Sequence, residues 1–129
     1  MKLANKTVLL ASITPIILFL FNGCAVTMKP EFSPLRELPP EALKVVSPGD
    51  VEVLTGEPRI GKEYIELGYI TIDESKVSPI MTMSKSEKDI IEMVRQEAAN
   101  HGADAVIKFS ITGEHPGRKA KGIAIVYKK

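Results

Sequence analysis

Residues 97–107 read EAANHGADAVI, and here the chain changes from the period of a helix to the period of a strand. Upstream, apolar residues recur at three- and four-residue spacing from Ile90 to Ala98, which is typical of one buried helix face. Downstream, alternate residues from Ala105 to Ile111 are apolar, as in a half-buried strand. Gly102 lies between the two patterns, where a residue in the left-handed conformation commonly ends a helix. This stretch therefore predicts a helix that leads directly into a strand.

The predicted helix spans Glu87 to His101, and the strand after it spans Ala103 to Thr112. Two serines compete to cap the start of this helix. Ser84 has a glutamate three residues later, which is the pattern of a capping box, and Ser86 is the second candidate. The sequence therefore predicts a well-defined helix start within these few residues.

Three further β-prone segments flank this unit: Val51–Leu54, Glu63–Asp73 and Ala120–Tyr127. Gly68 interrupts the second of them where the apolar phase changes, which indicates a β-bulge or a close approach by another part of the chain. The order ββαββ predicts an α+β fold, in which one helix packs on one face of an antiparallel sheet. The other face of the sheet is then left to water or to a partner.

The first 23 residues have the pattern of a secretory signal peptide. Residues 1–6 carry two lysines and no acid, and residues 7–21 run for 15 positions without a charge. A membrane-spanning helix needs about 20 apolar residues, so this run is short for a permanent span. Residues 20–24 (LFNGC) then resemble the lipobox, the cleavage site of bacterial lipoproteins.

The lipobox resemblance implies cleavage between Gly23 and Cys24 and acylation of Cys24, the only cysteine of the chain. Each methylene buried in a bilayer contributes about 0.8 kcal/mol, so several acyl chains would hold the protein at the membrane permanently. Ala25 follows the cysteine instead of aspartate, which by the same resemblance implies the outer membrane of a bacterial envelope, facing the periplasm. An ordinary signal peptide with an incidental cysteine and an uncleaved anchor stay open as alternatives.

Charge and cysteine content narrow the function further. The chain has 17 basic and 16 acidic residues, and two of the basic residues lie within residues 1–23, which leaves the mature part with a formal charge of −1. This balance argues against nucleic acid as a partner, because phosphate binding needs a net basic face. With one cysteine no intramolecular disulfide forms, so the domain depends on a small apolar core, and a homo-oligomer is a fair expectation.

The sequence predicts three parts: a signal peptide (1–23), an acylated cysteine with a proline-rich tether (24–50), and a small α+β domain (51–129). The middle part contains five prolines and no useful periodicity, which favours an extended, semi-rigid spacer. Fully extended, it would reach about 90 Å at roughly 3.5 Å per residue. The alternative is that this segment packs against the domain.

Two motifs in the C-terminal part carry a second resemblance. Residues 64–70 read YIELGYI, and residues 97–107 carry the AANHGADAV pattern at the helix end. Together they resemble the YbjQ-like and RcsF-like small domains of bacteria, over roughly residues 51–127. The motifs are structural, and they imply the fold more than a function. RcsF-like envelope sensors carry several disulfide-forming cysteines, which this domain lacks, so sensing by their mechanism is not expected.

YbjQ-like proteins have been labelled as heavy-metal binders, and a metal-binding oligomer is therefore the alternative function. His101 and His115 lie at the two ends of a predicted strand, about 30 Å apart at roughly 3.3 Å per residue. A shared metal would need one histidine from each of two subunits, and solvated surface histidines are the simpler interpretation. Thioethers can bind Cu(I), but packing is the commoner role for the methionines of this chain: Met28, Met81, Met83 and Met93.

No serine, cysteine or threonine lies in a nucleophile motif, and no phosphate-binding glycine loop is present in the sequence. Arg118, Lys119 and Lys121 form the most basic cluster, which predicts either a contact with anionic headgroups or an envelope polymer, or a charged hairpin that protects a sheet edge. We expect a non-enzymatic, lipid-anchored envelope protein without cofactor or metal, which binds, senses or assembles with another envelope component.

Overall fold

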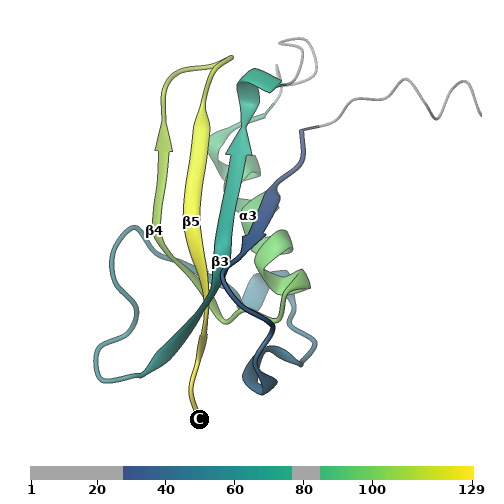
Figure 1. Cartoon of the computed structure of the whole chain (residues 1–129). Coiled ribbons are helices and arrows are strands. Elements are labelled where there is room, and N and C mark those ends of the chain that lie inside the picture. Colours follow the sequence, from purple (N-terminus) through teal and green to yellow (C-terminus); the bar gives the residue numbers. More distant parts are fainter. Residues whose placement is uncertain (1–27, 77–84) are drawn as a thin grey trace, which may run out of the picture.

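A computed structural model describes residues 28–76 and 85–129 of the chain. These residues form one five-stranded sheet with a single α-helix on one of its faces (Figure 1). The strands are β1 (Glu31–Pro34), β2 (Glu52–Val53), β3 (Tyr64–Asp73), β4 (Ala105–Thr112) and β5 (Lys119–Tyr127); the helix is α3 (Glu87–Asn100), and the short 3-10 turns are η1 (Pro40–Ala42), η2 (Pro48–Asp50) and η3 (Glu74–Lys76). No helix among these residues has the length and apolar character needed to cross a membrane.

The sheet has the strand order β1-β3-β5-β4-β2. Three of its four pairings are antiparallel, but β2 lies parallel to β4, with Glu52 opposite Ala105 and Val53 opposite Val106. The predicted α+β class with one helix on one face is confirmed, whereas the wholly antiparallel sheet is wrong at this edge. The connection between β2 and β4 contains β3 and α3, and a connection of that length allows parallel neighbours.

The predicted tether over residues 24–50 is wrong from Met28 onward, because this segment is part of the domain. Strand β1 pairs with the outer edge of β3, and the Leu35 N–H continues the pairing by donating to the Leu67 carbonyl at 3.0 Å. Met28 is 9% exposed and belongs to the main core, as does Ala42. The domain therefore begins at or before residue 28, as the packing alternative predicts.

The prolines of this segment stand where the fold tolerates them. Pro34 ends an edge strand, where a missing N–H breaks no central ladder. Pro40 and Pro48 each begin a 3-10 turn, where the fixed φ of proline is already suitable and its N–H would have no partner. The prolines of this segment therefore lie in an edge strand and in turns of the folded domain, and they do not form a spacer.

Gly68 allows β1 to approach β3, as the sequence predicts. The β3–β5 register shifts between Glu66 and Gly68, which is a β-bulge. A Cβ atom at Gly68 would lie 2.6 Å from the Phe32 ring and 2.6 Å from the Ser33 carbonyl oxygen, both of β1. The glycine is therefore required by β1, a strand that lies in the segment predicted to be a spacer.

The ends of α3 also follow the sequence. Ser86, the second of the two candidates, is the N-cap and forms a capping box with Asp89, so the predicted box of Ser84 with Glu87 is wrong; Ser84 itself lies outside the described residues. Gly102 terminates the helix with φ +72°, in the left-handed region. A side chain at Gly102 would also overlap the Ala42 carbonyl, so this glycine serves both the helix end and the packing of η1.

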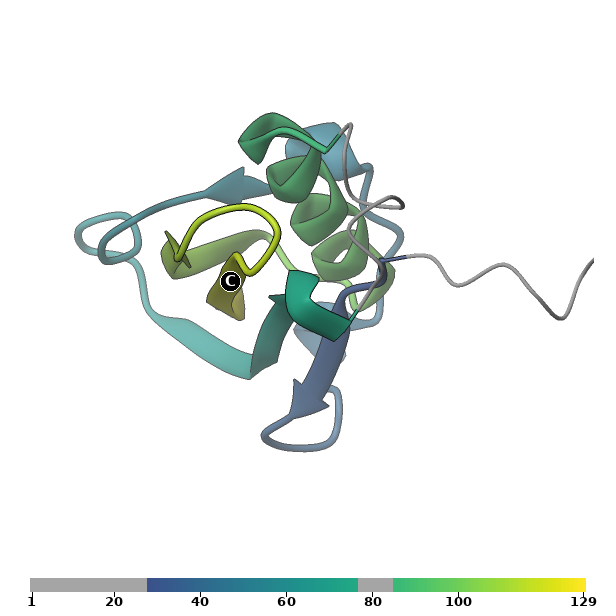
Figure 2. The same cartoon turned by 90° about the horizontal axis from the view of Figure 1, so that it is seen from above.

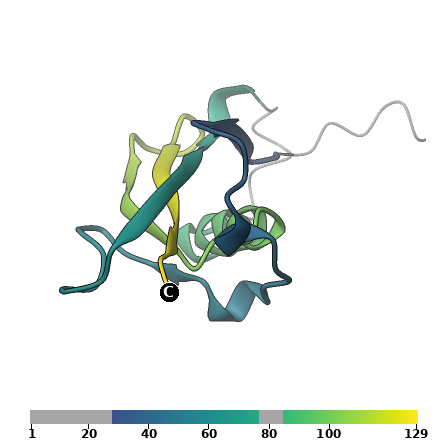
Figure 3. The ribbon, with the colours of Figure 1, turned by 60° about the horizontal axis from the view of Figure 1, so that its bottom comes forward.

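The sheet carries apolar residues on both faces. The main core lies between the sheet and α3, and a smaller cluster of Ala105, Ile107 and Ile125 lies on the other face. The loop between β2 and β3 swings out on the side of the sheet opposite α3 (Figures 2 and 3). It attaches there through the Lys108 N–H, which donates to the Gly56 carbonyl at 2.9 Å. The expectation of an uncovered second face is therefore wrong at this end of the sheet.

Candidate functional site

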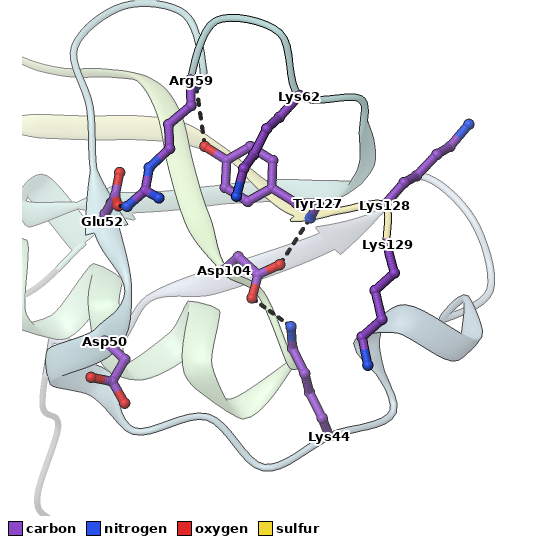
Figure 4. Close-up of a pocket in the computed structure, with 9 residues that line it drawn as sticks. All are labelled: Lys44, Asp50, Glu52, Arg59, Lys62, Asp104, Tyr127, Lys128 and Lys129. Atoms are coloured by element: carbon purple, nitrogen blue, oxygen red, sulfur yellow. Dashed lines mark hydrogen bonds and ion pairs between the residues drawn. The ribbon is translucent and has the colours of Figure 1, made fainter.

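A charged pocket of about 420 Å³ lies at the end of the sheet where β5 finishes (Figure 4). Its side chains come from four segments: residues 44–52, which run through η2 into β2; the β2–β3 loop; the residue before β4; and the end of β5 with the residues after it. Nine residues line this charged pocket, and eight of them are lysine, arginine or carboxylate residues: Lys44, Asp50, Glu52, Arg59, Lys62, Asp104, Tyr127, Lys128 and Lys129.

Asp104 is the fixed carboxylate of the charged pocket. Its Oδ2 accepts a hydrogen bond of 2.8 Å from the Tyr127 backbone N–H, and its Oδ1 contacts the Lys44 ammonium at 2.5 Å. Asp104 directly precedes β4, so the backbone of two neighbouring strands determines its position. Both of its oxygens are therefore occupied, one of them by a cation that the segment after η1 supplies.

Tyr127 forms the aromatic part of the charged pocket. The Arg59 backbone N–H donates to the Tyr127 hydroxyl at 3.3 Å, and the Arg59 guanidinium pairs with Glu52. The Lys62 ammonium lies 5.3 Å from the centroid of the Tyr127 ring, within the range of a cation–π contact. Two residues of the β2–β3 loop are thus held on the end of β5 by one tyrosine.

The charged pocket has five cations and three carboxylates, a surplus of two positive charges. Lys44 and Arg59 are paired inside it, and Lys128 makes a long contact of 3.6 Å with the exposed Glu63 outside it. Lys62 and Lys129 make no ion pair with any described residue. Exposed ion pairs such as Lys128–Glu63 contribute little stabilising energy, so the Lys128 ammonium is available to bind a ligand.

A second polar cluster lies at the opposite end of the sheet, where Glu74 is buried with 0% of its side chain exposed. Arg118 holds it from two nitrogens: Nε lies 3.1 Å from each carboxylate oxygen and Nη2 2.6 Å from Oε2. His115 Nδ1 lies 3.0 Å from Oε1. Hydrogen bonding to the Arg118 side chain lowers the pKa of Glu74, and the same bond raises the pKa of Arg118. Because this cluster ties the β4–β5 hairpin to the end of β3, its role is structural.

The structure separates the three residues predicted as a partner contact. Arg118 is turned inward onto Glu74, with 11% of its side chain exposed, so its charge is already neutralised. Lys119 lies opposite Asp73 of β3, and the Lys121 ammonium lies 5.4 Å from the centroid of the Tyr69 ring. The predicted basic patch is therefore reduced to two lysines, each with a neighbour on β3. Gly23 and Cys24 lie outside the described residues.

Each histidine contacts a carboxylate of its own subunit. His101 Nε2 lies 3.0 Å from Glu97, and its ring stacks on Phe32 with 3.6 Å between centroids. His115 contacts Glu74, so neither histidine is simply a solvated side chain. The described parts of the chain hold no group of three His, Cys, Asp or Glu suited to a metal ion. Met81 and Met83 lie outside those parts, Met28 is in the core and Met93 packs against it.

The charged pocket was not predictable from the sequence, because its residues come from four separate segments. Asp104 alternates with apolar neighbours like any polar residue of a half-exposed strand, and Lys44 lay in the presumed tether. The only local signal was the pair of lysines at positions 128 and 129, and two adjacent lysines alone do not indicate a site.

Comparisons with protein-family models, with curated protein sequences and with solved structures found no match for this chain. The function is therefore inferred from the anchor sequence and from the geometry of the charged pocket.

Proposed function

We propose that this protein is a non-enzymatic, lipid-anchored component of a bacterial envelope that binds an anionic partner with its charged pocket. The LFNGC stretch at residues 20–24 supports the anchor, which would sit on Cys24 at the periplasmic side of the outer membrane. The observation that carries the binding role is the charged pocket itself, where eight of nine lining residues are charged and two lysines have no carboxylate partner among the described residues.

The contacts within the charged pocket support binding more than proton transfer. Asp104 is occupied by a backbone N–H and by Lys44, and the Tyr127 hydroxyl accepts from a backbone N–H. Lys62 and Lys129 offer ammonium groups beside these fixed side chains. An ammonium is a strong donor to carboxylate or phosphate oxygens, and such charge-assisted bonds are stronger than neutral ones. The ligand chemistry that fits is therefore a carboxylate or phosphate group on an envelope polymer or protein.

Site-specific photo-crosslinking in intact membranes tests this proposal. A photoreactive residue at Asp50, which lines the charged pocket, leaves its five cations in place and should give a discrete crosslinked product. The control position is Ile60, which is 103% exposed and does not line the charged pocket. K62E should abolish the product captured from Asp50, because it replaces a ligand-binding ammonium by a carboxylate. Equal products from Asp50 and Ile60, or a product from Asp50 that K62E leaves unchanged, would contradict a binding role of this pocket.

No observation favours the metal-binding alternative. Each histidine is held by a carboxylate of its own subunit, Glu97 or Glu74, so a metal shared across a dimer would first have to displace these contacts.

A further inference from the structure

The folded domain begins within four residues of the predicted acylation site. Met28 is buried in the main core, and β1 starts three residues later. Four residues of fully extended chain reach at most about 14 Å at roughly 3.5 Å per residue. The surface beside Met28 would therefore be held next to the bilayer by the chain itself.

That surface carries an apolar groove of about 470 Å³, between the segment before β1 and the outer side of α3. Three apolar residues line it, Met28, Pro30 and Met93, together with four polar ones, Lys29, Glu92, Gln96 and Glu97. Both carboxylates have a partner: Glu92 pairs with Arg95 at 3.5 Å, and Glu97 contacts His101 at 3.0 Å. Both carboxylates of the groove are therefore already paired when the groove approaches lipid headgroups.

We propose that this groove is the surface with which the domain rests on the bilayer, and that lipid is its partner. The proposal rests on the proposed lipid anchor at Cys24. A tether this short gives the groove a high effective concentration at the membrane, so even a weak contact is populated. Methionine side chains are flexible and polarisable, which suits contact with a disordered lipid interface. The bilayer is the expected occupant because the short chain between Cys24 and Met28 would link this groove covalently to the lipid anchor.

This orientation separates the groove from the charged pocket. At the start of β1, Glu31 lies opposite Thr71, whereas Tyr127 of the charged pocket lies opposite Tyr64 at the other end of β3. Seven residues of strand, at about 3.3 Å each, correspond to about 23 Å. Figure 1 shows the β2–β3 loop at the end of the sheet away from the first described residues. The groove and the charged pocket share no lining residue, so a domain resting on its groove leaves the charged pocket outside the contact surface.

The chain contains no tryptophan, so one introduced tryptophan reports on its own surroundings. The acylated full chain, reconstituted in phosphatidylcholine–phosphatidylglycerol vesicles with brominated lipid, should show several-fold stronger quenching for M93W than for the control I60W. Q96W, at an exposed position that lines the groove, keeps the test valid where M93W perturbs packing. The intact mass of each preparation is measured alongside.

Stronger quenching at both groove positions supports the proposal. Equal quenching at Gln96 and Ile60 in an acylated protein overturns the docking surface but leaves the anchor standing. A blue-shifted but unquenched emission from Q96W overturns it as well, because a protein surface such as a second copy then covers the groove. A mass without acyl chains refutes the anchor itself, and the docking surface falls with it.

Discussion

Arg118 is expected to be a major contributor to stability, although it is a basic residue in a surface hairpin. In the variant R118M the Glu74 carboxylate stays buried and loses its three contacts to the guanidinium, at 3.1, 3.1 and 2.6 Å. Removing one partner of a buried ion pair costs about 3–5 kcal/mol. Glu74 keeps the Arg118 backbone N–H at 3.4 Å and His115 at 3.0 Å, so we expect the lower end, about 3 kcal/mol.

This loss is large for a domain of this size. Each kcal/mol shifts the melting temperature of a 60–100-residue domain by about 4–8 °C, so R118M should melt at least about 12 °C lower. Urea unfolding followed by circular dichroism gives the free-energy difference directly. The double variant E74Q/R118M should recover part of the loss, because no charge is then buried without a partner. K76M, which breaks the exposed Lys76–Glu31 pair, is the matched control and should cost less than about 1 kcal/mol.

The lowered pKa of Glu74 determines how the stability of the domain changes with pH. The pKa of Glu74 is lowered in the folded state by Arg118, so its stabilisation is complete above the ordinary carboxyl pKa and is lost as pH falls through the lowered value. The gap between wild type and R118M should therefore narrow in acid. A loss below about 1 kcal/mol at pH 7, or a gap that widens on acidification, would refute the reasoning.

Three further changes test the fold. G68A places a Cβ 2.6 Å from both Phe32 and the Ser33 carbonyl, so it should destabilise the domain by at least about 2 kcal/mol in urea unfolding. The control G56A has open space around it and should be nearly neutral. Equal effects of the two variants would count against the close approach of β1 to β3. S86A removes the N-cap and should cost about 1 kcal/mol by the same assay, and an unchanged midpoint would show that another residue caps α3. F32A should cost about 3 kcal/mol if β1 belongs to the domain and almost nothing if it is spacer.

The parts of the fold that local signals determine were predictable from the sequence. The period of α3 and Gly102 lie within one helix and its end, and the structure has both; of the two candidate capping serines it uses the second, Ser86. Gly68 was also recognised, because a glycine at a change of apolar phase is a local sign of a bulge.

Elements that depend on distant partners were not predictable. Strand β1 has four residues, ends in proline and gains its order from β3, more than thirty positions away. Strand β2 has two residues, too few for a pattern to indicate its parallel direction. Arg118 looked like a free surface charge because its buried partner, Glu74, lies 44 positions earlier. The charged pocket was hidden for the same reason, since tertiary contacts alone assemble it.

The most direct test of the account is the intact mass of the protein purified from membranes, compared with the variant C24S. If Cys24 is the anchor, the chain begins at Cys24 and carries covalent acyl chains, and the C24S variant no longer partitions with the membrane. An unacylated mass, or a C24S protein that stays as firmly with the membrane as wild type, would contradict it.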